Sequence, residues 1–149
     1  MKLLILNEGD VAKLLPIDVC IDLVADGLKA LSGGDAVNPL RQIMWLPDKR
    51  GLLGMMPAFM GGDAEKLGVK VLSIFPGNHG SDIDSHQGAM LLFDAKNGVL
   101  KAVMNAGALT AVRTAAASGV ATRLLAREDA CDLAILGSGV QAHSHLAAM

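Results

Sequence analysis

Aromatic residues and paired cysteines are both scarce in this sequence. Aromatics make up 3% of the 149 residues and tyrosine is absent, which argues against a stacking surface for single-stranded nucleic acid. The net charge is −2 with acids and bases intermixed, so no basic face is expected for nucleic acid or an anionic membrane. Cys20 and Cys131 show no paired spacing. We therefore expect a reducing, cytoplasmic location rather than a disulfide framework.

Several other signals are missing. No apolar run is long enough to span a bilayer. No G-x-S-x-G motif and no paired Cys/His site is present, so a hydrolase has no support. Asp82, Asp84 and His86 share one polar loop and could suggest a metal, but no further ligand cluster supports that reading. We expect no metal site.

The residues that are present predict an α+β fold. Hydrophobic residues make up 52% of the chain and charged residues 19%, which allows a substantial core. Apolar patterning and turn residues predict a mixed, largely antiparallel sheet with helices. We expect strands at residues 2–6, 40–46, 52–60, 67–75, 89–93 and 99–104, with hairpin turns at 47–51 and 96–98. We expect helices at residues 8–15, 16–32 and 106–126.

The pattern changes to a strand followed by a helix at residue 131. Residues 133–136 are four consecutive apolar residues, typical of a buried parallel strand, and a helix-forming run follows the glycines. Gly137, Gly139 and Ala142 give the form G-x-G-x-x-A, which is typical of the start of a dinucleotide-binding (Rossmann) fold. Gly137 would form the tight turn, and Gly139 would let the backbone approach a diphosphate at the helix N-terminus. A glycine-rich turn that binds no nucleotide is the alternative.

Three cations are set among apolar residues. Lys70 shares a strand face with Leu72 and Ile74, and a lysine on such a face needs an anion or must reach water. Arg113 lies in the first half of an alanine-rich helix, where the helix dipole gives a cation no help. Arg41 opens a strand. If the three converge, they would bind a carboxylate, with arginine as a bidentate fork and lysine as a point charge.

Each cation also has a structural alternative. Lys70 could extend its amine to solvent from the strand start, and Arg113 could form an internal salt bridge. Arg41 could be an exposed arginine at a sheet edge. The sequence leaves these alternatives open.

Taken together, several stretches resemble the ornithine cyclodeaminase and mu-crystallin family, which includes ketimine reductases and an archaeal type of alanine dehydrogenase. The matching stretches are residues 39–41, 54–58, 68–70, 85–87, 91–93, 109–116 and 137–142. The Thr-x-x-Arg-Thr-Ala-Ala stretch and the Gly-x-Gly-x-Gln-Ala stretch are specific in combination. Residues 85–87 and 139–142 look closest to the mu-crystallin side.

The resemblance implies hydride exchange between a nicotinamide cofactor, NAD or NADP, and a small amino acid or cyclic imino acid. It implies that Arg41, Lys70 and Arg113 bind the substrate carboxylate, and it includes Lys70 in the catalytic set. It also implies cofactor-binding roles for Ser85, His86, Arg113, Thr114, Gly137, Gly139, Val140, Gln141 and Ala142. The implied assembly is a homodimer that pairs sheets across its two-fold axis.

The resemblance further implies a division of the chain near residue 128. Residues 1–128 would form a substrate-binding and dimerisation domain with its connecting helix, and residues 129–149 would start a truncated Rossmann domain. The family's proton-transferring Asp and its ribose-binding residue would lie beyond Met149. We therefore expect a fragment, inactive by itself, of an oxidoreductase or cyclodeaminase. The alternative is a non-catalytic dimerisation or small-ligand-binding module left by truncation.

Overall fold

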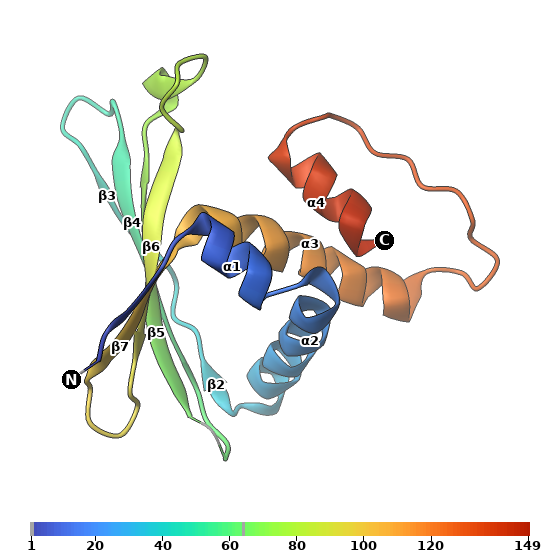
Figure 1. The fold of residues 1–149 in the computed structure, drawn as a ribbon, viewed down its shortest axis with the longest axis horizontal. Coiled ribbons are helices and arrows are strands. Elements are labelled where there is room, and N and C mark those ends of the chain that lie inside the picture. The colour runs from blue at the N-terminus through green and yellow to red at the C-terminus, as the bar shows by residue number, and fades with distance from the viewer. Residues whose placement is uncertain (1, 64) are drawn as a thin grey trace.

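The computed structural model describes residues 2–63 and 65–149, which form one mixed sheet and a layer of helices (Figure 1). In chain order the elements are β1 (Leu4–Leu6), α1 (Glu8–Leu14), α2 (Ile17–Gly33), β2 (Ala36–Val37), β3 (Gln42–Trp45), β4 (Leu52–Met60), β5 (Lys66–Ile74), the 3-10 turn η1 (Pro76–Asn78), β6 (His86–Phe93), β7 (Leu100–Asn105), α3 (Ala106–Leu125) and α4 (Val140–Ala148). The predicted α+β class is confirmed.

The seven-stranded sheet has the order β1-β7-β6-β5-β4-β2, and β3 also pairs with β4. β1 is parallel to β7, and the other pairs are antiparallel. Both predicted hairpins form. Leu46 N–H donates to Gly51 O in the first turn, and Asp94 N–H donates to Val99 O in the second. Neighbours in sequence therefore pair in space from β3 to β7.

The helices begin and end at residues suited to these positions. Asn7 and Asp10 form a capping box at the start of α1, and the Asn105 side chain accepts from Ala108 N–H at the start of α3. Gly34 ends α2 with a φ of 87°, a left-handed conformation that glycine adopts without strain. In the described residues, no helix has the length and apolar character needed to cross a membrane.

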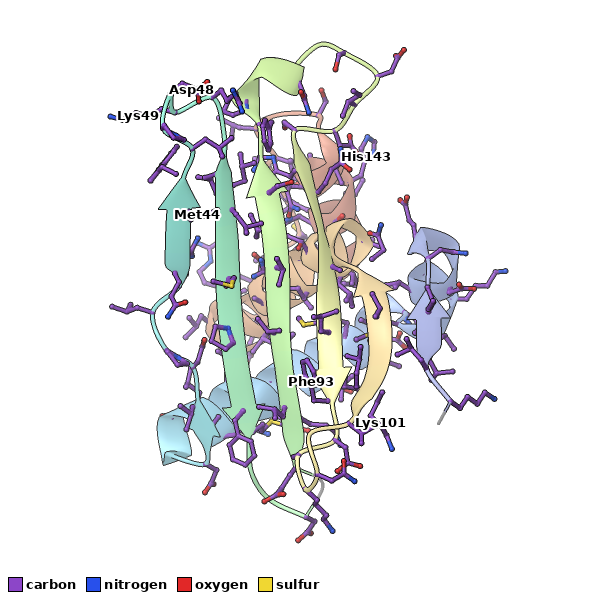
Figure 2. All side chains as sticks on the ribbon, turned by 90° about the vertical axis from the view of Figure 1, so that its left-hand side faces the viewer. Met44, Asp48, Lys49, Phe93, Lys101 and His143 are labelled. Carbon is purple, nitrogen blue, oxygen red and sulfur yellow. The ribbon has the colours of Figure 1, made fainter. Side chains whose placement is uncertain are left out.

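The helices lie on one face of the sheet, and α3 packs mainly against α2 and α4. The buried apolar residues are small, and those of α3 include Ala115, Ala116 and Val120. Figure 2 looks onto the opposite face, where no helix of the described residues lies and where Met44 and Phe93 are found. Met44 is 56% exposed on this face. The sheet therefore buries only one of its two apolar faces within this chain.

The predicted strand at residues 133–136 does not form, and this prediction was wrong. Residues 127–139 run as an irregular segment that lies away from the sheet (Figure 1), and Leu136 is 96% exposed. A strand exists only when a neighbour satisfies its backbone N–H and C=O groups. The described part of the chain places no strand beside this segment. The two-residue strand β2 was also missed, because it is too short to show any alternation.

Candidate functional site

Lys70 lies in β5, in a row of methionines that crosses the sheet. In the strand register Lys70 pairs with Met56 of β4 and Met90 of β6, and Met90 pairs with Met104 of β7. Paired residues project from the same face of a sheet, so these side chains share the face of the lysine. Thr110 of α3 contacts Lys70, which identifies this face as the one covered by helices. Lys70 is therefore the one charged residue in a row of methionines on the helix-covered face.

A short chain of hydrogen bonds connects Lys70 to the start of α3. Lys70 Nζ donates to Thr110 Oγ1 at 2.8 Å, and Thr110 Oγ1 donates to the Ala106 carbonyl at 2.6 Å. One turn later, Thr114 Oγ1 donates to the Thr110 carbonyl at 2.6 Å. Lys70 is thus half-buried and directed at the helix rather than extended freely into solvent.

The three predicted cations lie close enough for their charges to interact. Burial lowers the pKa of Lys70 below its ordinary value of 10.5, and the positive charges of Arg113 and then Arg41 lower this pKa further. Within the described residues, none of these cations takes part in an ion pair. An internal salt bridge for Arg113 is therefore not observed there. Three nearby positive charges that form no ion pair among the described residues could hold a small anionic ligand.

A cleft of about 860 Å³ opens beside Lys70, between the sheet and the N-termini of α3 and α4. Of the predicted site residues, it is lined by Lys70, Ser85, His86, Val140 and Gln141. The cleft thus brings together residues from β5, β6 and α4 that are far apart in sequence. The structure does not place Arg41, Arg113, Thr114, Gly137, Gly139 or Ala142 among its lining residues.

The loop before β6 forms one wall of this cleft. Ser85 Oγ lies 3.1 Å from His86 Nδ1, so the two predicted side chains form a hydrogen-bonded pair. The Asn78 and Gln87 side-chain amides both donate to the Asp84 carbonyl and hold the loop in shape. The described residues contain no group of three His, Cys, Asp or Glu side chains arranged to hold a metal ion.

The glycine turn has an open backbone at the start of α4, although its predicted strand is missing. Gly137 has a φ of 112°, which an L side chain rarely adopts, and a Cβ added at Gly139 would meet no atom within 4 Å. Gly139 is the N-cap of α4. Because glycine has no side chain, it leaves the first N–H groups of this helix uncovered. Val140 and Gln141 at this helix start line the cleft. The free N–H groups of α4 therefore open toward the cleft that contains Lys70, and such groups favour an anion.

Sequence reasoning missed the polar contacts that fix these elements to one another. It assigned no role to the Thr110 hydroxyl as the partner of Lys70. It also missed the contact between α3 and α4, where Ser118 Oγ lies 3.0 Å from His145 Nε2 and His145 Nδ1 lies 2.7 Å from the Gln141 carbonyl. The only available signal was a polar residue on an otherwise alanine-rich helix.

Known proteins resemble this chain over most of its length. Mouse ketimine reductase mu-crystallin (Mus musculus) is 42% identical over 112 residues, which are 75% of this chain and 36% of that protein. A Δ(1)-pyrroline-2-carboxylate reductase from Thermococcus litoralis, solved in complex with NADH and L-proline, superposes with a TM-score of 0.90 at 39% identity over 97% of this chain and 45% of that one. An archaeal alanine dehydrogenase dimer with bound NAD superposes with a TM-score of 0.91 at 30% identity, covering 99% of this chain and 45% of that chain.

The chain spans less than half the length of each of these relatives. The family model for ornithine cyclodeaminase/mu-crystallin matches residues 1–149, the whole of the present sequence. The chain belongs to the ornithine cyclodeaminase/mu-crystallin family.

Proposed function

We propose that the protein containing this chain catalyses NAD(P)-dependent hydride transfer to or from a small amino acid or cyclic imino acid. The observation that carries the proposal is a half-buried lysine, Lys70, bonded to Thr110 at the cleft, whose pKa is lowered first by burial and then by the nearby charges of Arg113 and Arg41. Like charges held near one another without an ion pair are costly, and an anionic ligand relieves that cost. A substrate carboxylate is the anion that amino and imino acids share.

In this proposal the three cations bind the carboxylate and orient the carbon that exchanges hydride. The arginines offer paired N–H donors that match the two carboxylate oxygens, and Lys70 offers one donor from the sheet. Leu72, Ala108 and Ala111, which line the cleft together with Lys70, would form an apolar surface for the carbon skeleton of the substrate. Binding the carboxylate at a fixed point holds the reacting carbon in place, so less entropy is lost when the hydride is transferred.

Residues on the other side of the cleft would hold the cofactor. The nicotinamide ring supplies the hydride exchange when the cofactor is bound. We assign Ser85, His86, Arg113 and Thr114 to its nicotinamide side. The diphosphate would lie on the turn formed by Gly137, Gly139, Val140, Gln141 and Ala142. Two similar structures contain NADH or NAD, which supports this assignment. Residues 129–149 would then be the first part of a cofactor domain, and residues 1–128 a substrate-binding and dimerisation domain.

We also propose that the protein is a homodimer that covers the helix-free face of the sheet. The chain exposes 10480 Å², against about 7,200 Å² expected from the area scaling of folded monomers of 15.4 kDa. Ile5 is 75% exposed and Met55 is 39% exposed, and both project from this face by their register. Large apolar side chains exposed together on one face are typical of an interface. A cytoplasmic location remains part of the proposal.

The test is an assay of the full-length protein with a panel of cyclic imines and amino acids, each offered with NADH, NADPH or their oxidised forms. We expect turnover of at least one substrate that carries a carboxylate, followed by cofactor absorbance. Arg113→Ala should raise KM for that substrate, whereas Arg123→Ala, on the exposed end of the same helix, should not. If no cofactor changes the protein fluorescence and no substrate turns over, the hydride-transfer proposal fails. A non-catalytic dimerisation module would then be favoured.

A further inference from the structure

The hydrogen bond between Lys70 and Thr110 of α3 has a fixed donor and a fixed acceptor. Thr110 Oγ1 carries one proton, and that proton is donated to the Ala106 carbonyl at 2.6 Å. Toward Lys70 Nζ, at 2.8 Å, the same oxygen can therefore only accept a hydrogen bond. An ammonium group makes a stronger bond of this kind than a neutral amine does, because its donor is charged. The acceptor thus favours the protonated lysine.

From this geometry we infer that Thr110 is a positioning residue that holds Lys70 in its ammonium form and directs it into the cleft. This inference rests on the proposed function, since it concerns how Lys70 binds a substrate anion. The Thr110 hydroxyl is the only side-chain hydrogen-bond partner that Lys70 has within the described residues. Its position is itself fixed by the first turns of α3 through the Ala106 carbonyl.

Several influences act against the ammonium form. Burial, Arg113 and Arg41 all lower the pKa of Lys70. The hydrogen bond that Lys70 donates to Thr110 opposes these influences at the one atom where a substrate carboxylate would be bound. The other charged or titratable groups facing this cleft are Glu8 of α1, Asp82 and Asp84 of the loop, and His86 of β6.

The bond also limits where the ammonium group can point. A lysine has four rotatable side-chain bonds, and a free lysine would lose much of its conformational freedom on binding a ligand. One of the three N–H donors of Lys70 is already directed at Thr110, so the directions open to the other two are restricted. A ligand then binds an arranged donor rather than a mobile one.

The experiment compares Thr110→Val, Thr110→Ser and Thr122→Val in the full-length protein. Valine keeps the branched shape and removes the acceptor, while serine keeps the acceptor. Thr122 is exposed on the same helix and controls for the effect of valine on α3. The first readout is the pH profile of kcat/KM. The second is the rate at which Lys70 is acylated by acetic anhydride as a function of pH, followed by peptide mass spectrometry.

We expect Thr110→Val to raise KM for the carboxylate substrate about tenfold, the scale for losing a hydrogen bond to a charged group. The pKa of Lys70 should fall further, so the basic limb of the pH profile and the acylation curve should both move to lower pH. Thr110→Ser should restore both curves, and Thr122→Val should leave them unchanged.

The inference is overturned if the acylation curve of Lys70 in Thr110→Val coincides with the wild-type curve. It is also overturned if kcat falls equally at every pH, because that would indicate a purely structural role for Thr110. If valine prevents folding, Thr110→Ala removes the acceptor with less bulk and is judged by the same curves. The acylation readout requires no turnover, so an inactive wild-type protein would refute the proposed function while still deciding the role of Thr110.

Discussion

Replacing Lys70 by methionine should separate binding from stability in the full-length protein. Methionine is the residue that already flanks Lys70 on β4 and β6, so the change extends an existing apolar row. The variant loses a charged donor to the substrate carboxylate, worth roughly 1.5–3 kcal/mol. We therefore expect kcat/KM to fall by about 10- to 100-fold.

The same change should leave the unliganded protein as stable as before or more stable. Lys70→Met removes a half-buried ammonium that is repelled by Arg113 and Arg41. Thr110 Oγ1 keeps its bond to the Ala106 carbonyl, so no buried donor is left unpaired. After allowance for solvent screening, we expect a gain of roughly 0.5–1 kcal/mol, or about 1–4 °C in Tm.

The gain in stability of Lys70→Met over the wild type should become smaller as the pH rises. The folded-state pKa of Lys70 lies below its ordinary value of 10.5, so the unfolded chain binds more protons between these two values. Wild-type stability therefore rises with pH through that window, and the difference in Tm between Lys70→Met and wild type shrinks.

Thermal unfolding and steady-state kinetics across pH provide the measurements, and Lys66→Met on the same strand is the matched control. The reasoning is refuted if Lys70→Met lowers Tm by several degrees. It is equally refuted if Lys66→Met raises KM as strongly as Lys70→Met does.

Two further predictions concern packing around the site. Gly88→Ala should lower Tm by more than 5 °C, because its Cβ would collide with the Val71 carbonyl of the neighbouring strand, whereas Gly77→Ala has open space and should change Tm little. Melting curves of both variants test this, and equal Tm values would contradict it. Ser118→Ala should cost about 1 kcal/mol through loss of its bond to His145 and should raise KM for NAD(P)H more than KM for the substrate. Cofactor and substrate titrations test this, and a larger rise in KM for the substrate than in KM for NAD(P)H would contradict it.

The sheet was predictable because its strands are neighbours in sequence. The residues at 47–51 and 94–99 reverse the chain within a few positions, so β3 meets β4 and β6 meets β7 with little choice of partner. Alternation of apolar residues then decides which face each side chain takes. This logic placed Lys70 on the face of Leu72, and both line the same cleft.

The strand expected at residues 133–136 failed for the opposite reason. Its apolar run satisfies the composition of a parallel strand, but a parallel strand depends on neighbours supplied by crossover connections. The described residues offer none beside it, and Leu133 is 53% exposed. Composition can indicate that a segment would pair, whereas the partner must come from elsewhere in the fold.

The candidate site was predictable only in part, because its contacts depend on where the start of α3 meets the sheet. The sequence identified Arg41, Lys70 and Arg113 as cations among apolar residues, and the family resemblance grouped them. Neither could indicate that the Thr110 hydroxyl meets Lys70, since that contact joins residues 40 positions apart through helix-on-sheet packing. Side-chain hydrogen bonds between elements depend on the tertiary arrangement and leave no periodic signal in the sequence.

The half-buried position of Lys70 explains why the proposed site would respond to an anion. Burial removes part of the water that would otherwise stabilise the ammonium charge, and Arg113 and Arg41 add repulsion, so all three lower the pKa of Lys70. A carboxylate that enters the cleft would meet the same ammonium with the same reduced screening. In the strand register Met56 and Met90 flank Lys70 and bring no charge of their own. A charged residue at either position would therefore change the repulsion and the attraction together.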